Sequence, residues 1–217
     1  MTGADALAAG LDALGLELDA SARRRLLAYR DELARWGRVH NLTSVREPER
    51  MVPVHLLDSL ALLPLVRGRA LADVGSGGGL PGVPLAIADP GLRVTLIEPR
   101  AKRALFLAHV ARTLALGNVI VERSRAEDVH PGAAFDTVVT RALGTLAEFV
   151  AAAGSLCRPG GCLLAAKGRD PRAELDALPP GWRAEVLPLV VPGVDAPRHA
   201  VRLEPPAAAP GGADEED

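Results

Sequence analysis

A short apolar run followed by a glycine-rich turn constrains this chain more than any other feature. The run ends at Asp73, residues 75–79 read Gly-Ser-Gly-Gly-Gly, and a helical pattern begins after Gly82. Strand, glycine turn and helix bring backbone N–H groups and a helix N-terminus close to a ligand, and a Cβ would block that approach. The segment therefore predicts a ligand-binding turn rather than a flexible surface loop.

The spacing of the glycines helps to separate two classes of ligand. The dinucleotide fingerprint G-x-G-x-x-G can be placed on Gly77, Gly79 and Gly82, but it then starts late for a turn that follows the strand directly. The nucleoside turn of S-adenosylmethionine-dependent methyltransferases has an acidic residue at the strand end, where Asp73 stands. S-Adenosylmethionine has no pyrophosphate, so it does not need the phosphate-cradling register. We therefore expect S-adenosylmethionine as the cofactor. The alternative is a nicotinamide cofactor, as used by an oxidoreductase.

Strands and helices alternate along the chain after the turn. The expected later strands lie at 93–98, 119–122, 135–140 and 162–166, with a final pair near 183–191 and 199–204. Alternation of this kind predicts an α/β fold with a doubly wound, Rossmann-like parallel sheet. Because no long helix separates the final pair, we expect an antiparallel hairpin at one edge, as in class I methyltransferases.

The N-terminal third has a helical pattern. Ser21 is the expected N-cap of a helix that ends near Trp36, and another helix is expected after Pro48. The predicted division is a helical cap at 1–67, a methyltransferase domain at 68–206 and a disordered acidic tail at 207–217.

Composition limits the class of protein. Of 217 residues, 48% are apolar, which is ample for one core. Two cysteines without metal spacing indicate a reducing, cytoplasmic setting, and no apolar window is long enough to predict a membrane span. The net charge of −2 includes four acids at 214–217, so the part before them is mildly basic.

Several polar residues stand where expected strands end, which is where open parallel sheets bind ligands. Glu98 is placed to accept hydrogen bonds from ribose hydroxyls, and the turn at 124–128 is placed to face an adenine. Arg141 follows the fourth expected strand and could orient a cofactor carboxylate or clamp a phosphate.

His55 and Asp58 lie on one face of the helix expected after Pro48. There they either line a site or form a structural pair.

Together these segments carry a resemblance to a known family. Over about residues 10–204 the chain resembles the small-subunit ribosomal RNA methyltransferase G family, also called glucose-inhibited division protein B. The shared segments are Asn41-Leu-Thr-Ser44, His55-Leu-Leu-Asp-Ser59, Asp73-Val-Gly-Ser-Gly77, Leu80-Pro-Gly-Val-Pro84, Lys102-Arg103 with Phe106-Leu107, Arg141-Ala142, Lys167-Gly168 and Arg198-His199.

The resemblance implies an activity, a cofactor and a set of site residues. The family uses S-adenosylmethionine to methylate N7 of one guanosine, at position 527 in the 530 loop of 16S ribosomal RNA, so the implied partner is the small ribosomal subunit. We expect a monomer without a metal. The expected cofactor contacts are Gly75, Gly77, Leu80, Glu98, Ala126, Glu127 and Arg141, and the expected RNA contacts are His55, Asp58, Lys167 and Arg198. Many relatives have aspartate followed by serine where this chain has Glu98-Pro99.

The implied chemistry needs no assigned catalytic residue. Guanine N7 carries a lone pair and no proton, so attack on the sulfonium methyl needs alignment rather than a general base. Two other functions stay open from the sequence: an S-adenosylmethionine-dependent methyltransferase acting on a small molecule or protein, and a non-enzymatic RNA-binding module on the same fold. Dependence of methyl transfer on RNA separates these alternatives.

Overall fold

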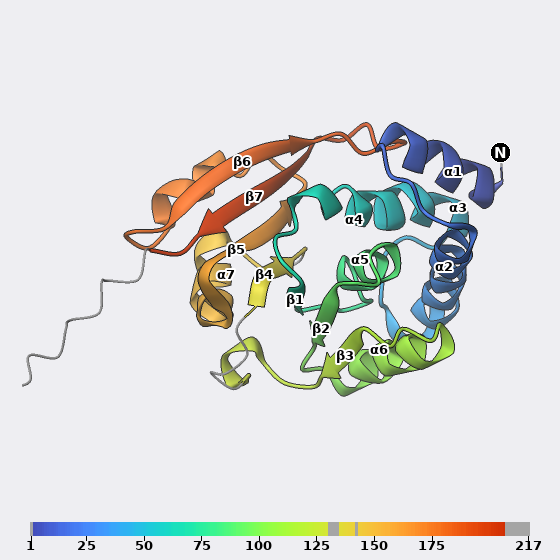
Figure 1. Cartoon of the computed structure of the whole chain (residues 1–217), viewed down its shortest axis with the longest axis horizontal. Coiled ribbons are helices and arrows are strands. Elements are labelled where there is room, and N and C mark those ends of the chain that lie inside the picture. The colour runs from blue at the N-terminus through green and yellow to red at the C-terminus, as the bar shows by residue number, and fades with distance from the viewer. Residues whose placement is uncertain (1, 130–134, 142, 207–217) are drawn as a thin grey trace, which may run out of the picture.

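Seven strands form one sheet within the part of the chain that this computed structural model describes, residues 2–129, 135–141 and 143–206. The strands are β1 (Ala70–Val74), β2 (Arg93–Ile97), β3 (Val119–Glu122), β4 (Phe135–Thr140), β5 (Cys157–Lys167), β6 (Arg183–Leu189) and β7 (Arg198–Glu204), in the order β3-β2-β1-β4-β5-β7-β6 (Figure 1). The first five strands run parallel, and β7 is antiparallel to both β5 and β6. This topology confirms the predicted Rossmann-like methyltransferase fold with its hairpin.

Helices cover both faces of the sheet, and each face has its own apolar core. One face packs against α1 (Gly3–Ala13), α2 (Ala20–His40), α4 (Asp58–Leu60), α5 (Gly82–Ala88) and α6 (Ala101–Thr113). The other face packs against α7 (Leu146–Ala153). The remaining helical segments are α3 (Pro48–Met51), η1 (Val52–Leu57), η2 (Leu63–Leu65), η3 (Ala126–Asp128), η4 (Gly154–Leu156) and η5 (Arg172–Ala177).

Side chains alternate between the two cores because successive residues of a strand point to opposite faces. In β5, Leu164 and Ala166 pack with the N-terminal helices, whereas Leu163 and Ala165 pack on the α7 side. This alternation decides on which face each polar residue at a strand end is placed.

Two predicted helix details were wrong. Asp19, not Ser21, caps α2, and its carboxylate accepts a 2.6 Å hydrogen bond from the Ala22 N–H. The helix also continues past Trp36 to His40 and ends where Asn41 adopts a left-handed conformation, with φ of 50°. Asparagine tolerates that conformation, so it stops the helix as glycine often does.

The helix expected after Pro48 is a composite. Between α3 and α4 lies a turn of π-helix, η1, in which one extra residue enters the helical ladder. Pro53 near its start has no N–H to donate. His55 lies inside η1 and Asp58 directly follows it, so both predicted site residues lie on or beside the irregular turn. The predicted tail at 207–217 lies outside the described residues, and the division into cap and methyltransferase domain stays a prediction.

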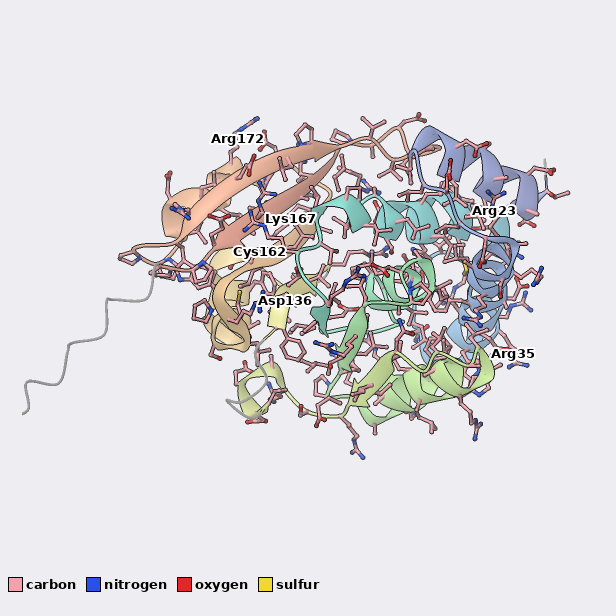
Figure 2. The ribbon with its side chains drawn as sticks, in the orientation of Figure 1. Arg23, Arg35, Asp136, Cys162, Lys167 and Arg172 are labelled. Carbon is pink, nitrogen blue, oxygen red and sulfur yellow. The ribbon has the colours of Figure 1, made fainter. Side chains whose placement is uncertain are left out.

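We predict that the Asp136 carboxylate is a main support of the sheet. It is buried at the start of β4, and it accepts hydrogen bonds from the N–H groups of Arg69 (2.6 Å) and Ala70 (2.7 Å) at the start of β1 (Figure 2). Asp136→Ala leaves both donors unpaired and should lower the free energy of unfolding by about 3 kcal/mol. Urea denaturation measures this loss.

The matched control is Asp170→Ala, which removes an exposed ion pair with Arg172 and an exposed hydrogen bond from the Arg172 N–H. That change should cost less than about 1 kcal/mol. Equal losses in the two variants would contradict the role given to Asp136.

Candidate functional site

The glycine turn is closed by hydrogen bonds from its own strand and helix. The buried Asp73 carboxylate accepts a 2.9 Å bond from the Gly82 N–H, and the Ser76 hydroxyl donates to the Asp73 carbonyl at 2.7 Å. Burial raises the pKa of Asp73 to about 7, although the Gly82 N–H and the nearby Arg141 charge act in the opposite direction. A Cβ on Gly82 would lie 2.7 Å from Asp73 Oδ2, so glycine is required for this contact.

The turn has one crowded side and one open side. Gly75 and Gly77 adopt positive φ angles of 69° and 58°, which glycine adopts without strain. A Cβ on Gly77 would meet no heavy atom closer than 3.7 Å, so this side of the turn is not crowded. The open side faces the ends of β1 and β2, which is the expected ligand side of such a sheet.

A cavity of about 250 Å³ lies on that side, and we call it the glycine-turn cavity. Its lining residues are Val74, Gly75, Ile97, Glu98, Pro99, Arg100, Arg103, Arg125, Ala126, Glu127, Leu143 and Ala152. Four of the predicted cofactor contacts, Gly75, Glu98, Ala126 and Glu127, therefore come together from three strand ends. Leu80 instead packs in the apolar core, and Arg141 lines a different cavity.

Glu98 supports the base of the glycine-turn cavity. Its carboxylate accepts one bond from the Gly77 N–H and one from the Arg100 N–H, both at 2.9 Å, and only 2% of the residue is exposed. Each carboxylate oxygen has two lone pairs, so capacity for two further donors remains. This arrangement fits the two hydroxyls of a ribose. The open side of the turn and the buried Ala126 fit the rest of a nucleoside.

Sequence reasoning assigned no role to the three arginines of this cavity, Arg100, Arg103 and Arg125. Arg103 Nη1 lies 3.9 Å from Glu98 Oε2, and Arg125 precedes the short helix η3. The Lys102-Arg103 pair was among the shared segments, so the sequence marked Arg103 without assigning it a role. Arg125 carried no separate signal.

A second cavity, of about 230 Å³, lies at the ends of β4, β5 and β7. We call it the arginine cavity, and it is lined by Val54, Asp58, Arg141, Ala166, Lys167, Gly168 and Arg198. Asp58 binds both arginines, accepting from Arg198 Nε at 2.8 Å and from Arg141 Nη1 at 3.4 Å. Two guanidinium groups thus share one carboxylate, and positive charge remains in excess at this point.

Lys167 is bound on the other face of the sheet. Its Nζ donates to the Gly144 carbonyl at 2.8 Å and to the Glu174 carboxylate at 2.9 Å. Figure 2 labels Lys167. The alternation along β5 explains this placement, because Lys167 follows Leu163 and Ala165 on the α7 side. Its charge is therefore already paired with an acid.

His55 connects Arg141 to the segment after α2. Arg141 Nη2 lies 3.2 Å from His55 Nδ1, and His55 Nε2 lies 2.7 Å from the Thr43 hydroxyl. Nδ1 also lies 2.9 Å from the Val54 carbonyl, which accepts a 3.3 Å bond from Arg141 Nη1. A guanidinium can only donate and a carbonyl can only accept, so the roles of the two ring nitrogens depend on the tautomer.

Of the two alternatives for His55 and Asp58, a direct side-chain pair does not form. Within the described residues the only bond between them runs from the Asp58 N–H to the His55 carbonyl, and both side chains contact Arg141. Burial, together with the Arg141 charge, lowers the pKa of His55 to about 4, so the imidazole is neutral near pH 7.

Comparison with known proteins identifies the family. The family model for rRNA small subunit methyltransferase G matches residues 22–201. The chain belongs to the rRNA small subunit methyltransferase G family. The protein named ribosomal RNA small subunit methyltransferase G in Xanthomonas campestris pv. campestris strain 8004 is 53% identical to this chain, and the match covers 90% of this chain and 92% of that one. The protein of the same name in Nitrosococcus oceani is 45% identical, and the match covers 94% of this chain and 95% of that one. Membership confirms the predicted methyltransferase activity and its S-adenosylmethionine cofactor.

Solved structures support the fold independently. The O-methyltransferase TomG from Streptomyces achromogenes superposes with a TM-score of 0.60 at 20% identity, covering 88% of this chain and 92% of that one. A SAM-dependent methyltransferase from Aquifex aeolicus gives a TM-score of 0.55 at 17% identity, covering 80% and 97%. At such identities the likeness concerns the fold alone.

None of the helices in the described part of the chain is long and apolar enough to cross a membrane. No group of three or more His, Cys, Asp or Glu side chains in the same residues is arranged to hold a metal ion.

We predict that His55 makes stability depend on pH. Between its ordinary pKa of 6.5 and its folded-state pKa of about 4, the unfolded chain binds more protons than the folded protein. The free energy of unfolding should therefore fall as pH drops through this window, by about 2–3 kcal/mol from this residue. Above pH 6.5 His55 adds no pH dependence.

The comparison is with His55→Gln, which keeps an amide nitrogen for Thr43 but does not titrate. Asp73 shifts in the opposite sense, but it is present in both proteins and cancels in the difference. Urea unfolding between pH 4.5 and 7.5 should show the two stabilities converging on acidification. Parallel curves would contradict the buried, neutral imidazole.

Proposed function

We propose that this chain transfers the methyl group of S-adenosylmethionine to N7 of one guanosine in 16S ribosomal RNA, at position 527 in the 530 loop. The family membership supports methyl transfer to small-subunit ribosomal RNA. The observation that supports RNA as the substrate is the arginine cavity, which lies next to the glycine turn at the same end of the sheet. A cytoplasmic site of action and a monomeric state complete the proposal, and the free thiols of Cys157 and Cys162 fit a reducing compartment.

The residues present fit a reaction that needs no base. S-Adenosylmethionine supplies an activated methyl group when bound. Guanine N7 attacks with a lone pair that carries no proton, so the site has to align the reactants rather than accept a proton. His55 fits this scheme because both of its ring nitrogens are hydrogen-bonded within the protein.

Counting donors separates the roles of the two arginines. Of its five N–H groups, Arg141 directs three at Val54, Asp58 and His55. Arg198 directs two at Asp58 and at the Pro197 carbonyl, and its other three have no acceptor among the described residues. Both side chains are about a quarter exposed. We therefore assign substrate contact to Arg198 and a supporting position between the two cavities to Arg141.

The chemistry restricts what Arg198 can hold. A hydrogen bond to N7 would occupy the lone pair that must attack, and a cation there would oppose the positive charge that the guanine gains. Guanine O6 and the phosphate of the target nucleotide remain as acceptors, and both accept charge-assisted hydrogen bonds. Asp58 fixes the guanidinium through Nε, and the Nη2 group has no acceptor in the part of the chain that the structure describes.

We predict that Arg198→Ala lowers kcat/KM for RNA by about 30- to 100-fold, as expected for loss of a charged hydrogen bond. Arg198→Lys keeps the charge but not the planar fork, and it should recover only part of the rate. Lys167→Ala should have a smaller effect because Lys167 is paired with Glu174. Methyl transfer at saturating cofactor provides the measurement.

Arg183→Ala is the matched control, because Arg183 is an exposed arginine in an ion pair with Glu204 on the neighbouring strand. It should leave methyl transfer unchanged, and all variants should bind S-adenosylhomocysteine normally. A fully active Arg198→Ala protein would remove Arg198 from the substrate site.

The function itself is tested with small ribosomal subunits that lack the modification. The protein is incubated with these subunits and S-adenosylmethionine carrying a labelled methyl group, and the labelled nucleotide is mapped. The proposal expects label at N7 of one guanosine in the 530 loop. Cofactor binding without label on subunits or free 16S RNA would contradict the RNA target and favour a small-molecule or protein substrate.

A further inference from the structure

Helix α2 reaches the glycine turn through one buried tyrosine. The Tyr29 hydroxyl donates a 2.6 Å hydrogen bond to the Gly78 carbonyl, across 49 residues of sequence. Tyr29 is fully buried, and burial raises the pKa of Tyr29, so the hydroxyl keeps its proton and remains a donor. The N-terminal helices are thus bonded directly to the main chain of the ligand-binding turn.

This bond completes the support of one peptide group. The Gly78 carbonyl accepts from Tyr29, and the N–H of the same peptide, on Gly79, donates to the Ser76 carbonyl at 2.7 Å. Both polar groups of the peptide are therefore fixed, one by α2 and one by the turn itself. Without Tyr29 the carbonyl would be left without its partner, and the peptide could reorient.

The other N–H groups of the turn are also occupied, with one exception. Those of Gly75, Ser76 and Gly77 donate to the Ile97 carbonyl or to the Glu98 carboxylate. Among the described contacts, the Gly78 N–H has no acceptor. Gly78 is itself buried and does not line the glycine-turn cavity, so Tyr29 acts on the cavity through the shape of the turn.

Packing holds the same residue from the same helix. A Cβ on Gly78 would lie 3.0 Å from a methyl group of Leu33, which follows Tyr29 by one turn of α2. A Cβ on Gly79 would lie 2.6 Å from Val83 and 3.3 Å from the Tyr29 hydroxyl. The turn is therefore wedged between α2 and α5, and its position depends on where α2 lies.

We infer that Tyr29 is a positioning residue for cofactor binding, acting from the N-terminal helices through the Gly78 carbonyl. It holds the turn in its binding-competent conformation before the cofactor arrives. When only a fraction of molecules has the competent conformation, the apparent affinity is reduced by that fraction. The inference depends on the cofactor, which the family membership establishes, and not on the identity of the RNA target.

Tyr29→Phe tests it, because this change removes the hydroxyl and keeps the ring. Calorimetric titration with S-adenosylhomocysteine, without RNA, should show a dissociation constant about three- to tenfold higher than that of the wild type. In methyl-transfer assays KM for S-adenosylmethionine should rise by a similar factor. KM for RNA and kcat at saturating cofactor should stay within about twofold.

The control is Leu26→Val. Leu26 is buried on the same face of α2, and none of its atoms is among those nearest to the glycines of the turn. It should cost a comparable amount of stability, about 1 kcal/mol, without changing cofactor affinity. Wild-type affinity in Tyr29→Phe would overturn the inference, as would an equal loss of affinity in Leu26→Val. Because binding is measured without RNA, failure of the RNA assignment would leave this result unaffected.

Discussion

The hydrogen bond between the buried Asp73 carboxylate and the Gly82 N–H is the contact on which the rest of the site depends. It joins the end of β1 to the start of α5, and so it fixes the length and direction of the glycine turn between them. Burial of a carboxylate is costly, which is visible in a pKa raised to about 7, and its second oxygen has no partner in the described structure. The buried carboxylate therefore lowers the stability of the fold, but it gives the turn a defined shape.

Around that turn the fold separates two tasks. The glycine-turn cavity, with Glu98 at its base, lies at the ends of β1, β2 and β3, whereas the arginine cavity lies at the ends of β4, β5 and β7. Arg141 lies in the second cavity, yet its charge acts on Asp73 beside the first. The alternation of strand residues makes a finer division, because it places Arg198 on the face of the N-terminal helices and Lys167 on the α7 face. A nucleoside and a methyl acceptor can therefore meet at one edge of the sheet.

Local signals in the sequence were sufficient for the fold. Apolar runs, glycines and strand-end acids predicted the sheet, its hairpin, the glycine turn and the place of Glu98, whereas Ala126 and Glu127 were assigned from the family resemblance. What the sequence did not show were contacts between distant segments: the bond from Tyr29 to Gly78, the pairing of Lys167 with Glu174, and the sharing of Asp58 by two arginines. These contacts depend on three-dimensional packing, which residue spacing does not encode. The sequence also did not predict the π-helical turn at η1, because this turn adds one residue to a helix whose apolar pattern is unbroken.

A crystal structure with bound S-adenosylhomocysteine tests the central claim most directly, because it locates the reacting sulfur relative to both cavities. We expect the ribose hydroxyls to bind Glu98, the adenine to lie against Ala126, and the sulfur to lie at the boundary between the two cavities. Methyl transfer would then take place at the edge of the arginine cavity. An adenosine bound in the arginine cavity, or a sulfur directed toward Arg100 and Arg125, would contradict the division of the site and the role given to Arg198.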